Sequence, residues 1–282
     1  MSTTCDHIQA NPDISGIGIR INLYVTTLLL VLVPNTRRTA PLLNVLTSNA
    51  GISGAALLIT ALIETGKHRL SLYHAIFIIH ALFFMGISIS PIDECAGKYK
   101  GNLTARVLLS MILSHGLLLL FTGYAFYVWA TAPKFGQSPR CNDQIRYIIL
   151  FAIKIRATVG WLRKLWMAGL GFVFAMMIIL PLIGTCTVLL VKSNPSSVFV
   201  SSNPNNQPIR FSVTRLAFGL TPVYGIIHLE LYVKANKALL TDSEEALSFG
   251  QIYALVMIIS IGAELLHFIL TLCGHGDGDT DD

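Results

Sequence analysis

The sequence predicts an all-α fold, a polytopic membrane bundle of about seven transmembrane helices with one amphipathic interfacial helix. Hydrophobic residues make up 53% of the 282 residues and charged residues only 12%, whereas soluble domains carry roughly a quarter charged residues. The apolar residues gather in long runs, and about 20 apolar residues in a row suffice to span a bilayer. Such a chain cannot cover itself with a polar surface, so we expect residues 1–282 to form one integral membrane domain.

Seven apolar runs predict the spans. The sixth run in chain order is the weakest, because Phe211–Val233 contains Arg215, Pro222, His228 and Glu230. We interpret it as a spanning helix with a polar face, and a segment that folds back at the interface is the alternative. The predicted spans are 16–34, 41–63, 70–90, 107–130, 167–191, 217–233 and 250–273.

Arg20 lies inside the first run. If the span began after it, Ile21–Val33 would rise only about 20 Å, short of a hydrocarbon core of about 30 Å. Its side chain therefore either extends to the headgroups or forms a buried pair with an acid on another helix. Gly16 and Gly18 predict close approach of a neighbouring helix. The run lacks a basic n-region and a small-residue cleavage site, so we expect a helix rather than a removable signal peptide.

Basic residues predict which compartment each loop faces. We name the side that carries the amino terminus side A, and the opposite side is side B. With seven spans, side A also holds the loops 66–69, 131–166 and 234–248. Basic residues are modestly more frequent there, which predicts a cytosolic amino terminus in the plasma membrane or an endomembrane.

Two sequence features bear on this orientation. Asn102, in an Asn-Leu-Thr glycosylation acceptor on side B, agrees with it, because such acceptors are used only in a lumenal or extracellular loop. Cys5 and Cys141 both belong to side A. They would form a disulfide only if that side were oxidising, which points the other way.

The predicted interfacial helix, residues 145–164, lies between the fourth and fifth spans. A step of 100° per residue separates its apolar and basic side chains onto two faces, as in helices that lie on membranes. Trp161 and Trp166 suit headgroup depth. We expect anionic lipid to bind the basic face, and an acidic cytosolic partner is the alternative. The lipid-interface candidates are Arg146, Lys154, Arg156, Trp161, Arg163, Lys164 and Trp166.

A few polar residues occur inside the spans, where ionisable groups usually face the bundle interior. Interhelical hydrogen bonding is the simplest interpretation, and a ligand or ion pathway and a metal site are the alternatives. A single Glu-x-x-His pattern is too common to establish a metal site. We therefore assign no metal, no cofactor and no catalytic residue. The pathway candidates are Asn44, Ser48, His80, His115, Glu264 and His267.

Two segments outside the spans have polar compositions. Residues 192–210, rich in asparagine, serine and proline, predict a flexible loop on side B, and residues 274–282 predict an acidic tail. No sequence pattern indicates a nucleic-acid partner. A homo-oligomer or a cytosolic partner would be compatible with the chain.

Three stretches resemble motifs of a known protein group. They are "NPDISGIGIRINLYV" at 11–25, "SPRCNDQIRYIILF" at 138–151 and "SFGQIYALVM" at 248–257. They resemble uncharacterised multi-pass membrane proteins of mushroom-forming (basidiomycete) fungi, in which these motifs recur. The resemblance implies the topology and a fungal origin, and it implies no activity. All three motifs fall on side A, so we expect a side-A motif cluster of Asp13, Arg20, Asn142 and Gln251.

The leading functional hypothesis is a non-enzymatic integral membrane protein that acts in transport or sensing through a polar bundle interior. One alternative is a seven-helix, receptor-like sensor with the basic 145–164 helix as its cytosolic output. The other is a membrane-embedded enzyme with a metal at His80, His115, Glu264 and His267.

Overall fold

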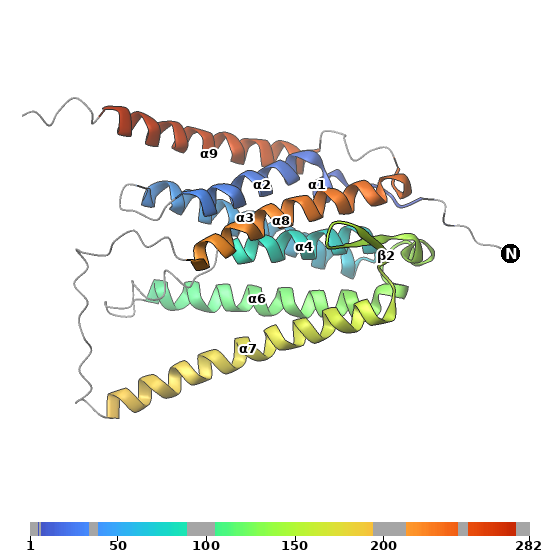
Figure 1. Ribbon diagram of the computed structural model, residues 1–282, viewed down its shortest axis with the longest axis horizontal. Helices are drawn as coiled ribbons and strands as arrows, with labels where there is room; N and C mark the ends of the chain where they lie inside the picture. Colours follow the sequence, from blue (N-terminus) through green and yellow to red (C-terminus); the bar gives the residue numbers. More distant parts are fainter. Residues whose placement is uncertain are drawn as a thin grey trace, which may run out of the picture.

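The computed structural model describes residues 5, 7–33, 39–88, 105–193, 213–241 and 248–274. The predicted loop 192–210, the acidic tail and Asn102 fall mainly or wholly outside these residues. The described α-helices are α1 (Pro12–Ser15), α2 (Ile17–Leu32), α3 (Ala40–Gly66), α4 (Leu72–Ser88), α6 (Ala105–Thr131), α7 (Gly160–Ser193), α8 (Val213–Asn236) and α9 (Phe249–Gly274). The long helices lie side by side, and successive ones alternate in direction (Figure 1).

Four of the described helical stretches are long and apolar enough to cross a membrane, and this suggests membrane integration. They are Pro12–Leu32, Ala40–Gly66, His115–Lys134 and Phe249–Leu270. The helical fold class is thus confirmed. Over the described residues, four helices rather than the predicted seven meet this criterion of length and composition. The remaining long helices differ in kind, because α4 has only 17 residues, α7 carries Arg163 and Lys164 in its first turns, and α8 contains Pro222 and Glu230.

Helix α4 occupies the centre of the bundle. Its sequence is apolar on every side, as expected of a helix surrounded by others, and Leu72 to Ile79 are all buried. It packs most extensively against α8 and also contacts α2, α3 and α6. Helix α9 is the opposite case, because only 11% of its most apolar stretch is buried. Its outward isoleucines and leucines form the kind of surface that lipid covers.

The predicted interfacial helix at 145–164 is wrong. Strand β1 (Arg146–Ile149) pairs antiparallel with β2 (Ile153–Arg156), and α7 begins at Gly160. Leu150 and Phe151 turn the chain with φ angles of 47° and 68°. The isoleucines that mimicked a helical face also alternate as strand residues, and β-branched side chains favour a pleated surface.

A tertiary contact fixes this hairpin. The Asn236 side chain accepts from the Arg146 backbone N–H at 2.7 Å and donates to the Arg146 carbonyl at 2.8 Å. It also donates to the Tyr232 carbonyl at 2.8 Å, within α8. The end of α8 therefore supplies strand-like hydrogen bonds to β1 that no local periodicity could reveal.

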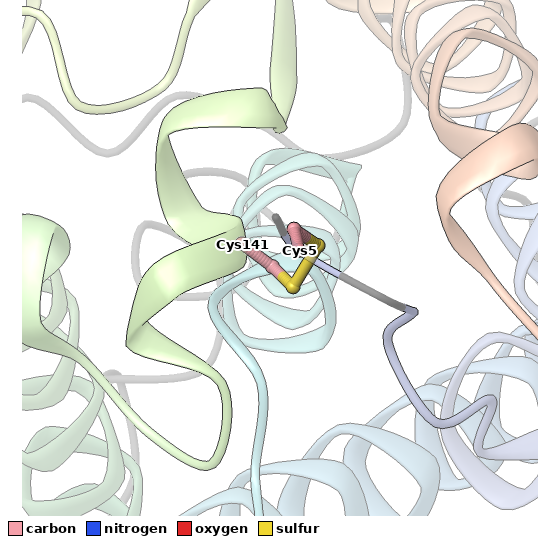
Figure 2. Close-up of a disulfide and its surroundings, with 2 residues drawn as sticks. All are labelled: Cys5 and Cys141. Atoms are coloured by element: carbon pink, nitrogen blue, oxygen red, sulfur yellow. A yellow bond between two sulfur atoms is a disulfide. The ribbon is translucent and has the colours of Figure 1, made fainter. Parts of the chain in front are cut away.

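The side-A end of the bundle carries a small cap. We define the cap as the strap (Cys5 and residues 7–11), the α6–α7 connection (132–159) and residues 239–241. The connection contains the 3-10 helices η1 (Ala132–Lys134) and η2 (Pro139–Gln144), and a third, η4 (Lys237–Leu239), follows α8. A disulfide joins Cys5 to Cys141 on η2 (Figure 2).

Backbone hydrogen bonds hold the strap at a second point. The Ile8 N–H donates to the Leu239 carbonyl at 2.8 Å, and the Thr241 N–H donates to the Ile8 carbonyl at 3.1 Å. The Ala10 N–H donates to the Thr241 hydroxyl at 3.1 Å. The strap is therefore tied both to the α6–α7 connection and to the segment that follows α8.

Candidate functional site

A pair of buried histidines joins the cap to the bundle. His80 on α4 and His228 on α8 stack with ring centroids 4.9 Å apart and an interplanar angle of 18°. His80 Nδ1 lies 2.7 Å from the Ile76 carbonyl oxygen, and its Nε2 lies 2.9 Å from the Tyr147 hydroxyl. His228 Nε2 lies 3.0 Å from the Ile148 carbonyl oxygen. Two adjacent residues of β1 thus bind two different helices, and we call this arrangement the histidine anchor.

The hydrogen-bond partners determine the proton positions. A carbonyl oxygen can only accept, so His80 Nδ1 carries the proton and its Nε2 accepts from the Tyr147 hydroxyl in the neutral ring, which burial favours. Burial also raises the pKa of the Tyr147 phenol above its ordinary value, so this hydroxyl stays a donor. By the same argument, His228 Nε2–H donates to the Ile148 carbonyl.

Two tryptophans pack beside the histidine anchor. Trp129 on α6 stacks on Trp166 of α7, with ring centroids 5.4 Å apart and an interplanar angle of 4°. Trp166 in turn packs edge-on against His80, with ring centroids 5.1 Å apart. Arg163 donates through Nε to the Trp129 carbonyl at 2.8 Å and through its guanidinium to the Ala130 carbonyl. Arg163 and Trp166 therefore pack on α6 and cap its carboxyl end. The other lipid-interface candidates, Arg146, Lys154, Arg156, Trp161 and Lys164, are exposed.

The six pathway candidates do not share one chamber. His80 is buried in the anchor, Glu264 is half-buried, and Asn44, Ser48, His115 and His267 are exposed. Asn44 and Ser48 line a groove of about 300 Å³ between α3 and α9, together with Ser260. Among the described residues, no three histidine, cysteine or acidic side chains are grouped as a metal site would require.

A buried polar network that the sequence reasoning missed lies between α2 and α3. Asn49 donates through Nδ2 to Asn22 Oδ1 at 3.1 Å and to Thr26 Oγ1 at 2.7 Å. Asn22 donates to Ser53 Oγ at 3.2 Å. Pairs four residues apart on each helix, Asn22 with Thr26 and Asn49 with Ser53, were the signal that could have revealed it. Such fully paired groups join helices where water is excluded.

Arg20 pairs with an acid on another helix, the second of its two predicted interpretations. Its guanidinium lies 2.7 Å and 2.8 Å from the two carboxylate oxygens of Glu230 on α8. The Tyr24 hydroxyl donates to the same carboxylate at 2.8 Å. The Arg20 side chain is 14% exposed and that of Glu230 is 47% exposed, so the pair lies at the bundle edge and is not buried as that interpretation expected.

Part of the side-A motif cluster meets where α9 starts. Asp13 accepts from the Gly250 N–H at 2.8 Å, and a Cβ placed on Gly16 would lie 2.5 Å from Gln251 Nε2. Asn142 instead donates to the Ala132 and Phe135 carbonyls inside the cap at 2.9 Å and 3.0 Å. Asp13 therefore contacts the residue before Gln251, whereas Asn142 and Arg20 have other partners.

A polar cleft of about 470 Å³ opens at the side-A end of the bundle. Its walls come from the strap, the α3–α4 turn, the first turn of α4 and the α6–α7 connection. Its polar and charged lining consists of Gln9, Asn11, Glu64, Arg69, His74 and Gln137. We call it the side-A cleft.

Comparison with known proteins found no match to this chain among family models, curated proteins or solved structures.

Proposed function

We propose that this chain is a multi-pass membrane sensor in which α2, α3, α4, α6, α7, α8 and α9 all cross the bilayer. The alternating directions of successive long helices support this reading (Figure 1). The position of α4 inside the bundle supports it as well, because a helix enclosed by spanning neighbours needs fewer lipid-facing residues of its own. Seven crossings would place the two chain ends on opposite sides.

We further propose that side A faces an oxidising compartment, either the cell exterior or an organelle lumen. The Cys5–Cys141 disulfide supports this orientation, because the cytosol keeps such thiols reduced. The opposite expectation depended on a modest excess of basic residues and on the Asn102 glycosylation acceptor of side B. In this orientation the basic hairpin and the start of α7 belong to the outer surface and are not a cytosolic output.

The histidine anchor is the observation that carries the sensing function. Tyr147 and Ile148 are neighbours on one cap strand, yet they bind His80 of α4 and His228 of α8, respectively. A ligand that moves the cap would therefore change how α4 and α8 pack. Sensing is favoured over transport, because Asn44, Ser48, His115 and His267 are exposed on the described bundle and do not line its interior.

Hydrogen–deuterium exchange of the protein in nanodiscs tests this coupling. Tyr147→Phe removes the hydroxyl that binds His80 and leaves a buried acceptor unpaired, which costs roughly 1–3 kcal/mol. We expect faster exchange in β1 and also in the turns of α4 and α8 that contain His80 and His228. Tyr127→Phe, at an exposed tyrosine on α6, is the matched control. Faster exchange confined to the hairpin would show that the cap is not coupled to the helices.

The fungal group and the lipid partner remain predictions. Two of the three stretches that suggested the group, 11–25 and 248–257, supply the Asp13–Gly250 contact.

A further inference from the structure

We propose that the side-A cleft binds a small zwitterion of the α-amino-acid type, with its carboxylate on Arg69 and its ammonium group on Glu64. This inference rests on the proposed sensing function and names the class of ligand that would drive it. Both charged side chains line the same cleft.

The charges of the cleft define the ligand class. Over the described residues, the one ion pair within salt-bridge distance is that of Arg20 with Glu230, so Glu64 and Arg69 do not neutralise each other. An arginine fork suits a carboxylate, and a carboxylate suits an ammonium group. A molecule that carries both charges would satisfy both residues, whereas a singly charged molecule would satisfy only one.

The size and accessibility of the cleft suit a small molecule. Its volume of about 470 Å³ falls in the range of roughly 300–1,000 Å³ typical of ligand pockets. Arg69 is exposed and Glu64 is half-buried, so the cleft opens to the side-A solvent. In the proposed orientation, ligand would arrive from outside the cytosol.

The amide groups of the cleft come from two parts of the cap. Gln137 Nε2 donates to Gln9 Oε1 at 3.3 Å, which joins the α6–α7 connection to the strap at the cleft wall. The strap itself is fixed by the disulfide of Cys5. A bound ligand that formed a hydrogen bond with Gln9 or Gln137 would compete with the bond between them. It would thereby move the strap relative to the α6–α7 connection.

The cleft also touches the central helices. His74 lines the cleft, and its Nδ1 lies 2.7 Å from Ser71 Oγ on the same turn. The His74 ring packs edge-on against Tyr73 at 4.9 Å, and Tyr73 stacks on Tyr232 of α8 at 5.4 Å and 11°. The cleft therefore adjoins the α4–α8 contact at Tyr73 and Tyr232. The histidine anchor lies at another point of the same α4–α8 contact.

Thermal unfolding of the full-length protein in nanodiscs, with and without added ligand, tests the inference. The probes are an equimolar mixture of the standard α-amino acids, followed by each amino acid alone, with acetate and methylammonium as singly charged controls. We expect at least one amino acid to raise the unfolding temperature. Neither singly charged probe should do so at the same concentration.

Charge-neutralising variants locate the binding. Arg69→Gln and Glu64→Gln should each weaken the apparent affinity at least about tenfold, because each loses a charge-assisted hydrogen bond. Arg69→Lys keeps the charge and should fall between the parent and Arg69→Gln. Lys67→Gln, an exposed cation in the same turn that does not line the cleft, should bind like the parent. The unfolding temperature without ligand shows whether each variant is folded.

Three results would overturn the inference. They are the absence of stabilisation by any amino acid, equal stabilisation by acetate alone, and equal responses from Arg69→Gln and Lys67→Gln. These results are separable from a failure of the sensing proposal, because the exchange experiment on Tyr147→Phe uses no ligand. Binding in the cleft without coupling through the anchor would leave a binding protein that does not sense.

Discussion

At the scale of single residues, glycines decide how closely α9 approaches α1 and α2. A Cβ on Gly250 would lie 2.8 Å from Asp13 Oδ1 and 3.2 Å from Asp13 Cα. A Cβ on Gly18 would lie 3.0 Å from the Gln251 carbonyl oxygen. Since backbone atoms cannot move aside as a flexible side chain can, these positions admit only glycine without a shift of the helices.

Gly250→Ala should therefore destabilise the protein by roughly 1–3 kcal/mol, the usual cost of overpacking. Gly262→Ala is the matched control on the same helix, because a Cβ there would meet nothing within 4 Å. Thermal unfolding of both variants in nanodiscs measures the difference. Equal unfolding temperatures for the two variants would contradict the close packing of α9 on α1 and α2.

Residue-scale prediction from the sequence was uneven. The glycines at 16 and 18 were correctly expected to admit a close neighbour, because their lack of a side chain is visible in the sequence. The importance of His228 and Tyr147 was not visible, because the two lie 81 positions apart in the chain and meet only after the hairpin folds onto α8. Asn22 and Asn49 differ, because their four-residue spacing from Thr26 and Ser53 was visible in the sequence, although the partner of each on the other helix was not.

At the scale of elements, the β1–β2 hairpin depends on α8 for its position. Asn236 is fully buried and offers both a donor and an acceptor to Arg146. The exposed turn residues Leu150 and Phe151 adopt positive φ angles. This left-handed conformation is unfavourable for residues other than glycine. The hairpin therefore needs tertiary hydrogen bonds to compensate for its own turn.

Asn236→Ala should release the hairpin. We expect a loss of roughly 1–3 kcal/mol in the free energy of unfolding, because two backbone groups of Arg146 lose their partner. Hydrogen exchange should become faster across residues 145–157. Lys234→Ala, at an exposed position on the same turn of α8, should leave exchange unchanged. Unchanged protection of the hairpin in Asn236→Ala would show that Asn236 does not hold it.

The same segment shows the limit of periodicity as a guide to elements. Long apolar runs located the helices well, because the apolar content of α3, α6 and α9 leaves little choice of structure in lipid. Residues 145–157 are short and mixed in polarity, and both a helical and a strand period fit their isoleucines. Only contacts with α8 and with the disulfide-bonded η2 decide between the two, and neither is local in sequence.

At the scale of the whole molecule, features of the chain disagree about orientation. The excess of basic residues on side A and the Asn102 acceptor on side B predict a cytosolic cap, while the Cys5–Cys141 disulfide predicts an oxidising side. One of those basic residues, Arg163, has a structural partner in the folded protein, because it donates to the carbonyls that end α6. A residue fixed in this way is weak evidence of topology, so we give the disulfide more weight.

Mapping glycosylation at both chain ends tests the central claim most directly. An Asn-x-Thr acceptor is fused to the protein on a flexible extension, before Met1 in one form and after Asp282 in another, and each form is expressed in eukaryotic cells. The account predicts a glycosidase-sensitive increase in mass for the amino-terminal form only. Modification of the carboxyl-terminal form alone would contradict the proposed orientation, and modification of both forms or of neither would contradict an odd number of crossings.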